Sequence, residues 1–172
     1  RAFVALSAKQ TRYTKLFGYY DGDQPLIYTA RRLAEMFDKI DAYFAENWCA
    51  VVIDSLSERI ALQGYNVTDA GTQGLLDSIW AANEMVLEAD DAHEAALVCG
   101  ESFIVAWPGA DGTPESYYND PRLCHIFYDP ERPRHPRLGA KWWVDEDGKR
   151  RMTLYYPDRL EYYRSEQAAE QV

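Results

Sequence analysis

The sequence lacks any apolar run long enough to cross a membrane. A membrane-spanning helix needs about 20 consecutive apolar residues, and the longest runs among these 172 residues are much shorter. The first residues also show no signal-peptide pattern, in which a charged segment precedes an apolar stretch. Hydrophobic residues make up 47% of the sequence and charged residues 27%. This balance is typical of a soluble globular protein, which we therefore expect.

Cysteine is also scarce, with Cys49, Cys99 and Cys124 as its only occurrences. Their spacing matches neither a disulfide framework nor a zinc site. Two of them lie inside the apolar runs WCAVVI and LVCG. We predict three reduced and buried thiols, as in a cytosolic protein.

Motifs that bind nucleotides or activate a nucleophile are missing as well. No segment matches GxxxxGK[ST] or GxGxxG, the two loops that cradle phosphate groups. The three histidines are His93, His125 and His135, and none lies near a glycine-rich turn that holds a serine. Because such a turn positions many catalytic serines, we expect no catalytic residue and no cofactor.

One segment, EADDAHEAAL, could offer metal ligands. It places Asp90, His93 and Glu94 within about one turn of a predicted helix. The second histidine of an HExxH zinc motif is absent, however, and carboxylates on a helix usually form a solvated face. We therefore predict no metal site. A cytosolic metal-dependent hydrolase using these three residues is the alternative function.

Two other charged segments have simple structural interpretations. The carboxylates of Asp145, Glu146 and Asp147 resemble calcium ligands, but VDEDGKR between two strand-like runs predicts a hairpin turn. The segment PERPRHPR is basic, short and broken by proline, which favours a solvated loop over a nucleic-acid patch. Its basic side chains are those of Arg132, Arg134, His135 and Arg137.

Charge is unevenly distributed along the chain, although the net charge is −10. The first 20 residues contain bases but no acids, and bases outnumber acids between Arg122 and Arg164. Between Glu35 and Asp120 there are seventeen acids and two bases. Since this acidic middle would repel phosphate groups, we expect it not to bind nucleic acid without sequence specificity.

Hydrophobic periodicity predicts helices in the first hundred residues. The predicted helices are 3–17, ended by Gly18; a helix with the apolar stripe Leu33, Phe37, Ile40 and Phe44; Trp48–Ala61, capped by Asn47 and closed by Gly64; Leu75–Ala82; and Met85–Gly100. A short strand is predicted at Leu62–Val67. The residues expected to face inward are Leu76, Ile79 and Trp80 in one helix and Leu87, Ala92, Ala96 and Leu97 in the next.

The remaining residues predict an antiparallel β-meander. β-Branched and aromatic residues dominate the runs SFIVAWP, LCHIFYDP, LGAKWWV, RMTLYYP and RLEYYR, which short turns separate. We predict an α+β fold, in which N-terminal helices pack on this meander. The expected regions are 1–61, mainly a helical arm and brace; 62–100, a short strand and helices; 101–164, the meander; and 165–172, a tail or the start of a further segment.

The order of these segments resembles the N-terminal half of portal proteins from tailed double-stranded-DNA bacteriophages. The similar stretches are YYDGDQPL from Tyr19, NWC leading the apolar helix, SER and GY further on, then IWAANEM, ALVCGESFIVAWP, YDPERPR and KWWVDEDGKRRMTLYYPDRLEYY. Each stretch is weak evidence by itself. Their order and spacing cover nearly the whole chain, and the chain corresponds to the wing region of such proteins.

The resemblance implies a structural protein of the virion. Portals are homo-oligomeric rings of about a dozen copies at one capsid vertex, assembled in the host cytoplasm, and double-stranded DNA passes through them without sequence-specific binding. Their partners are the terminase, which contains the ATPase, the capsid and scaffolding proteins, and the head-tail adaptor. An acidic surface suits a channel in which DNA slides. Rival interpretations are the hydrolase named above and a generic protein-interaction module.

The resemblance also sets expectations for particular residues and for the chain length. We expect Trp48, Val52 and Leu56 to pack under the meander, with Cys49 as a buried filler. The residues expected to matter structurally are Trp48, Gly64, Trp80, Gly100, Trp107 and Trp142. The opening Arg1 and the polar ending SEQAAEQV suggest a piece of a longer protein, which by itself should be largely monomeric in dilute solution.

Overall fold

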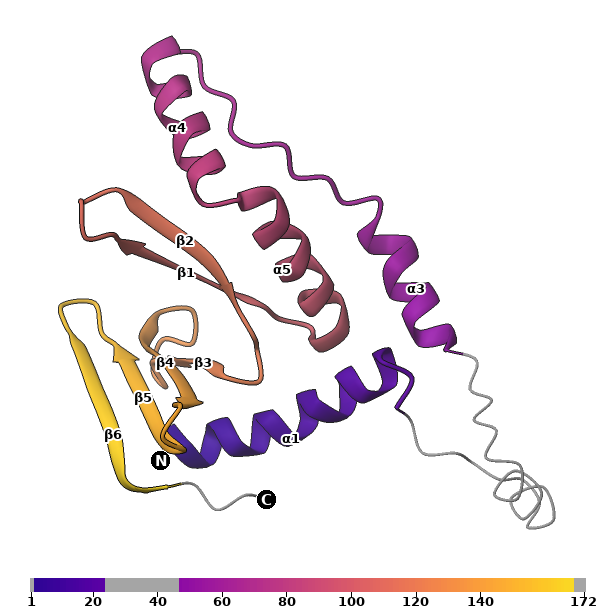
Figure 1. Cartoon of the computed structure of the whole chain (residues 1–172), viewed down its shortest axis with the longest axis vertical. Helices are drawn as coiled ribbons and strands as arrows, with labels where there is room; N and C mark the ends of the chain where they lie inside the picture. Colours follow the sequence, from indigo (N-terminus) through magenta and orange to yellow (C-terminus); the bar gives the residue numbers. More distant parts are fainter. Residues whose placement is uncertain (1, 24–46, 169–172) are drawn as a thin grey trace.

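A computed structural model describes residues 2–23 and 47–168, and in it four helices precede six strands (Figure 1). The helices are α1 Ala2–Tyr20, α3 Trp48–Ser57, α4 Ala70–Ala82 and α5 Met85–Cys99. The strands are β1 Phe103–Pro108, β2 Pro114–Asn119, β3 Cys124–Tyr128, β4 Pro136–Val144, β5 Lys149–Tyr155 and β6 Leu160–Ala168. The predicted α+β fold is confirmed. The helix predicted around residues 33–44 lies outside the described residues.

Helix α3 begins where the sequence predicts. The side chain of Asn47 accepts a hydrogen bond of 3.1 Å from the backbone N–H of Ala50, and so satisfies one free amide of the first turn. The helix ends at Ser57, earlier than the predicted Ala61. Gly64 does not close it, and lies instead with φ +121° in the segment between α3 and α4.

Helix α1 is longer than predicted, because Gly18 lies inside it rather than at its end. The chain reverses after Tyr20, where Gly22 takes a positive φ of 81°. The carbonyl oxygen of Tyr20 accepts a hydrogen bond from the Asn47 side chain. The side chain that caps α3 therefore also ties the end of α1 to the start of α3.

The inward faces predicted for α4 and α5 are confirmed in part, because the predicted residues of α4 are its least exposed apolar ones and only Leu87 of the α5 set is exposed. No residue of α4, all of which is described, is buried, and Leu76, Ile79 and Trp80 are only partly covered. In α5, Leu87 is 63% exposed, and Ala96 and Leu97 are half-buried. The predicted Ala92 is buried, together with Met85, Ala89, Ala95 and Cys99. This mostly small-residue face lets α1, α3 and β2 approach α5 closely.

The strand predicted at Leu62–Val67 is absent from this described segment, which runs between α3 and α4 without regular structure. The side chain of Gln73 in α4, rather than a neighbouring strand, forms hydrogen bonds with this segment. The Gln73 side chain accepts from the Val67 N–H at 2.9 Å and donates to the Tyr65 carbonyl oxygen at 2.9 Å. The Tyr65 ring also meets the Trp80 ring edge-on, with centroids 5.6 Å apart.

The strands form two antiparallel sheets rather than one meander. β1 pairs with β2 from Phe103 opposite Asn119 to Pro108 opposite Pro114, and the other four strands lie in the order β3-β4-β5-β6. β2 was not predicted, because its residues PESYYN lack a clear strand pattern. Helix side chains bind its outer amides: Asn83 accepts from the Ser116 N–H at 2.6 Å, and Glu88 accepts from the Tyr118 N–H.

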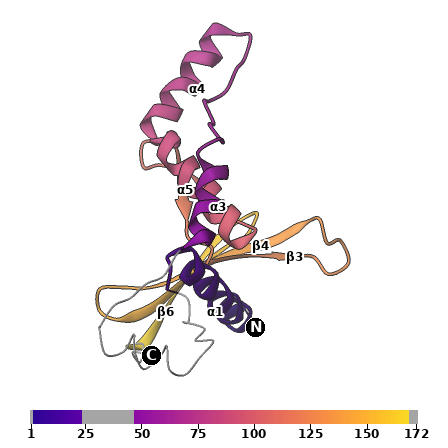
Figure 2. The ribbon, with the colours of Figure 1, turned by 90° about the vertical axis from the view of Figure 1, so that its right-hand side faces the viewer.

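The four-stranded sheet follows the predicted hairpins. The Asp145 N–H bonds to the Lys149 carbonyl oxygen at 2.9 Å, and the Gly148 N–H bonds to the Asp145 carbonyl oxygen at 2.9 Å. With Gly148 at φ 73°, these bonds close the β4–β5 turn where a calcium site was the rejected alternative. β6 continues to Ala168, beyond the predicted end of the meander at residue 164. The β3–β4 hairpin extends to one side of the molecule and α4 extends away at one end (Figure 2).

The buried residues lie where α1, α5 and the sheets meet. Leu6 and Tyr13 of α1 are buried, as are Cys124 and Ala140 of the larger sheet. Cys99 and Cys124 are free and buried, as predicted. Cys49 is exposed, so its prediction as a buried filler was wrong. Helix α3 packs against α1 and α5 rather than against a sheet.

A polar cluster joins α1 to both sheets. Lys9 forms an ion pair with Glu101, which also accepts a hydrogen bond from Tyr13. The Lys9 ammonium also donates to Nδ1 of His125 in β3 at 2.9 Å, so this nitrogen must be unprotonated. The Lys9 ammonium further lies 5.5 Å from the centre of the Phe103 ring in β1.

This cluster changes the pKa of its members. Burial acts to raise the pKa of Glu101, but the hydrogen bonds from Lys9 and Tyr13 outweigh it and the pKa lies below its ordinary 4.5. Burial and the nearby Lys9 charge lower the pKa of His125 below its ordinary 6.5, although Glu101 opposes them. Both residues therefore favour the folded state most when unprotonated.

Gly100 ends α5 in the left-handed region, with φ 84°, and its N–H bonds to the Ala96 carbonyl oxygen at 2.8 Å. Replacing Gly100 by alanine should lower the free energy of unfolding by roughly 1 kcal/mol, because a Cβ disfavours this conformation. Gly74 lies inside α4 with open space around it, so Gly74→Ala should raise that free energy by about 0.5–1 kcal/mol. Urea unfolding of both variants measures the contrast. Equal changes in the free energy of unfolding of the two variants would contradict this prediction.

The folded protein should lose stability as the pH falls from about 7 through the ordinary His125 pKa of 6.5. The unfolded chain then binds a proton at His125 that the folded chain resists, and Glu101 adds a second loss below about its ordinary 4.5. His125→Gln should flatten the dependence between pH 7 and 5.5, as measured by urea unfolding. His135→Gln, at an exposed position, is the control and should keep the slope. An unchanged slope in His125→Gln would contradict this account.

Candidate functional site

The residues of the hydrolase alternative do not form a metal site. Asp90 is exposed, whereas His93 and Glu94 are partly buried. Among the described residues, no group of three histidine, cysteine or acidic side chains is placed to hold a metal ion. Nδ1 of His93 is buried without a hydrogen-bond partner in the described part of the chain. The geometry therefore gives the hydrolase alternative no support.

An apolar surface lies on α3, residues 58–69, α4 and the first turn of α5, which together we define as the helical arm. Trp48 is 67% exposed and Leu75 is 60% exposed. Further exposed apolar side chains on this arm are those of Val51, Val52, Leu56, Ile60, Leu62, Tyr65, Val86 and Leu87. Monomeric soluble proteins rarely expose so many neighbouring apolar residues, and such surfaces commonly mark protein-protein contacts.

This arrangement corrects the predicted role of α3. Trp48, Val52 and Leu56 do not pack under a sheet, and all three are exposed. The apolar residues Trp48, Val51, Val52 and Leu56 form a stripe along α3 that is exposed among the described residues. Of the other residues expected to matter structurally, Gly100 caps α5, Trp80 contacts Tyr65, and Trp107 is partly exposed.

An apolar groove of about 530 Å³ lies beside the exposed stripe of α3, between the ends of α1 and α5. Tyr19 and Leu16 of α1 line one side, Trp48 and Val52 of α3 the other, and Val98 of α5 lies at its base. The exposed thiol of Cys49 also faces this groove. The groove adds to the apolar surface available to a partner.

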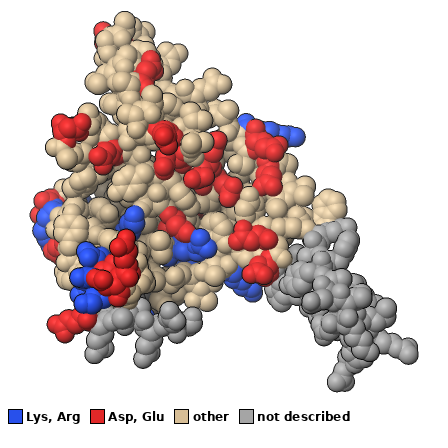
Figure 3. Space-filling model, viewed as in Figure 1, with Lys and Arg blue, Asp and Glu red and all other residues tan. Residues whose placement is uncertain are grey.

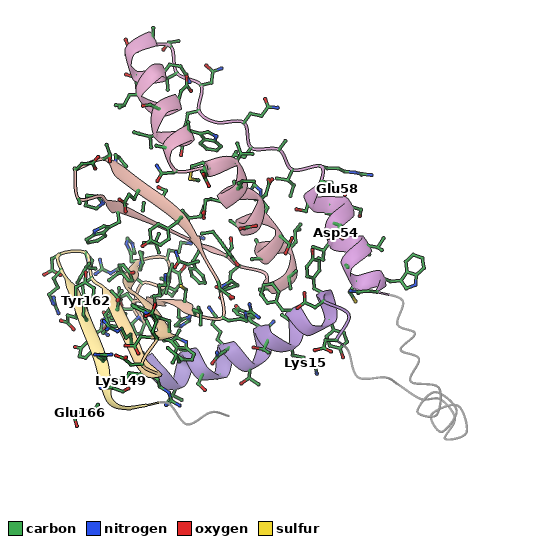
Figure 4. All side chains as sticks on the ribbon, in the orientation of Figure 1. Lys15, Asp54, Glu58, Lys149, Tyr162 and Glu166 are labelled. Carbon is green, nitrogen blue, oxygen red and sulfur yellow. The ribbon has the colours of Figure 1, made fainter. Side chains whose placement is uncertain are left out.

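A second groove, of about 570 Å³, lies between the end of α3 and the first half of α5. Its acidic side chains are Glu58, Asp90, Asp91 and Glu94. The side chains of Ile60, Leu62 and Val86 give it an apolar part. Acidic side chains gather over α3 and α5 in the space-filling view (Figure 3), and Glu58 is marked at the end of α3 in Figure 4. We call this the acidic groove.

Many basic side chains lie on the larger sheet and its turns. Arg132, Arg134, His135 and Arg137 are all exposed on the β3–β4 hairpin, where the sequence predicts a solvated loop. On the β4–β5 turn, Asp145 forms ion pairs of 2.8 Å with Arg151 and 2.9 Å with Arg164. These bonds hold the pKa of Asp145 at about 2. The aspartates of that turn therefore serve its structure.

No helix among the described residues is long and apolar enough to span a membrane. A comparison with curated proteins found no match. Comparison with protein families gave a match over residues 5–171 to the family described as "Phage portal protein, SPP1 Gp6-like". This match covers nearly the whole chain, in agreement with the resemblance carried by its motifs. The chain therefore belongs to the phage portal protein family, and it is a structural subunit of the bacteriophage portal, which forms part of the DNA conduit at the capsid vertex.

Proposed function

We propose that these residues form the wing region of the portal subunit and that their work is mechanical. In this role the chain packs against neighbouring copies and catalyses no reaction. The single observation that carries the proposal is the apolar surface of the helical arm, which the described residues of one copy leave exposed. Full burial of a valine or leucine side chain contributes about 1.5–3 kcal/mol. Neighbouring copies in a ring can recover this energy by covering these side chains.

The same proposal assigns partners to the complete subunit. The ring contains about a dozen copies, and it contacts the capsid, scaffolding proteins, the terminase and the head-tail adaptor. Double-stranded DNA passes through it without sequence-specific binding. Assembly takes place in the cytoplasm of the bacterial host, and the finished ring lies at the capsid vertex of the virion.

Charge supports the proposed passage of DNA without tight binding. From Asn47 to Asp120 the described chain has one base, Arg59, among many acids. Such a surface repels phosphate groups, since tight non-specific binding depends on lysine and arginine contacts to them. Where this part of the subunit lies near DNA, its charge favours sliding.

Ring assembly of the full-length portal protein tests the role of the arm. Val51→Asp combined with Val52→Asp places two charges on the exposed stripe of α3, where neither valine is buried. We expect the variant to fold but to yield mostly unassembled subunits, because each charge would be costly to bury in a contact. Size-exclusion chromatography with light scattering measures the ring fraction.

Ser55→Asp is the matched control for this experiment, because Ser55 is an exposed polar residue of the same helix. It should assemble as the unmodified protein does. Far-ultraviolet circular dichroism should show that all variants keep their helices. Normal rings from the double valine variant would contradict a role for this face of α3 in assembly.

A further inference from the structure

The acidic groove combines charge with an apolar lining. The carboxylates of Glu58 and Asp91 lie on its two walls, contributed by α3 and α5. Ile60, Leu62 and Val86 are each more than a third exposed there. Arg59 is the only base of the described segment 47–120. A complementary partner must therefore bring positive charge together with compact apolar groups.

The β3–β4 hairpin of this chain has that composition. Its tip, residues 129–137, reads DPERPRHPR and contains three prolines and three arginines. Arg134 and Arg137 are exposed and form no ion pair among the described residues, whereas Arg132 lies 3.5 Å from Asp129. Glu131 is the other acid of the tip.

Backbone bonds hold the tip in shape. The Asp129 N–H bonds to the His135 carbonyl oxygen at 2.9 Å, and the His135 N–H bonds to the Arg132 carbonyl oxygen at 2.8 Å. The Asp129 side chain also accepts from the Glu131 N–H at 2.9 Å. Proline fixes φ at three positions. An ordered tip loses little conformational entropy when it binds.

The hairpin cannot enter the groove of its own chain. It extends to one side of the molecule, clear of α3 and α5 (Figure 2). The groove lies between those two helices, over which the acidic side chains gather in Figure 3. The two surfaces are different patches of one molecule, so a contact between them joins one copy to the next. Contacts of this head-to-tail type generate closed rings when the rotation between copies closes.

We propose that the β3–β4 hairpin tip of one subunit docks in the acidic groove of the neighbouring subunit. Arg134 and Arg137 lie against the carboxylates of Glu58, Asp90, Asp91 and Glu94, and the prolines of the tip cover Ile60, Leu62 and Val86. This inference rests on the proposed ring and adds the contact that gives it direction. Charge complementarity of this kind fixes register and suppresses wrong pairings.

Charge reversal in the full-length portal protein tests the contact. The groove variant carries Asp90→Lys and Asp91→Lys, and the tip variant carries Arg134→Glu and Arg137→Glu. All four positions are exposed in one copy, so the subunits should fold. Each variant alone should raise the protein concentration needed for ring formation about tenfold or more, because like charges then face each other. A chain with all four changes should recover assembly.

The matched control carries Glu146→Lys and Asp158→Lys, which reverse two exposed acids outside the groove, and it should assemble normally. Unchanged assembly of both charge-reversed variants would overturn the proposed contact. Failure of the fourfold variant to assemble, when each pair of changes alone disrupts rings, would overturn it as well. Neither result would count against the proposed ring. Failure of the unmodified full-length protein to form rings would instead overturn the proposed function.

Cross-linking gives a second readout that does not depend on altered charge. Val86→Cys in the groove and Pro133→Cys in the tip are combined with Cys49→Ser, which removes the exposed native thiol. Treatment of assembled rings with a short bismaleimide should give a ladder of covalent oligomers on a denaturing gel. Chains carrying only one of the two introduced cysteines should give no ladder. Absence of a ladder from the paired chain in intact rings would overturn the proposed contact.

Discussion

The described residues of one copy leave the apolar side chains of the helical arm exposed, and this exposure connects the fold to the proposed function. Helix α5 packs its small-residue face against α1, α3 and β2. The apolar stripe of α3 and the segment after it are left in water, with Trp48 the most exposed residue of that stripe. Burial of such groups is the main favourable term in association. In the proposed ring, other copies complete the burial of these side chains.

The features predicted from sequence are those that local chemistry decides. Asn47 caps α3 and Gly100 ends α5 because both effects act within a few residues. The hairpin turn at Asp145 follows from its own residues for the same reason. The periodicity predicted helix α3, but an apolar pattern is identical whether its residues are buried within one chain or between two. The predicted position of Trp48, Val52 and Leu56 under a sheet was wrong for this reason.

Features that depend on distant residues could not be predicted. β2 pairs with β1, and Asn83 and Glu88 bind its outer amides, while Gln73 binds the LQGYNV segment, which forms no strand. The contact between Lys9 and His125 joins residues 116 positions apart. At the candidate site, the sequence supplied the acids and the arginines as separate runs. Only the fold shows a groove around the acids and places the arginine-rich tip away from it.

Hydrogen-deuterium exchange on the full-length portal protein, compared between assembled rings and unassembled subunits, tests the central claim most directly. Residues 61–66 lie in the arm without regular structure, so their amides should exchange rapidly in a free subunit. If neighbouring copies cover the arm, exchange of these amides should slow markedly in the ring, while amides in the β4–β5 turn remain unchanged. Equal exchange of residues 61–66 in rings and free subunits would contradict the account.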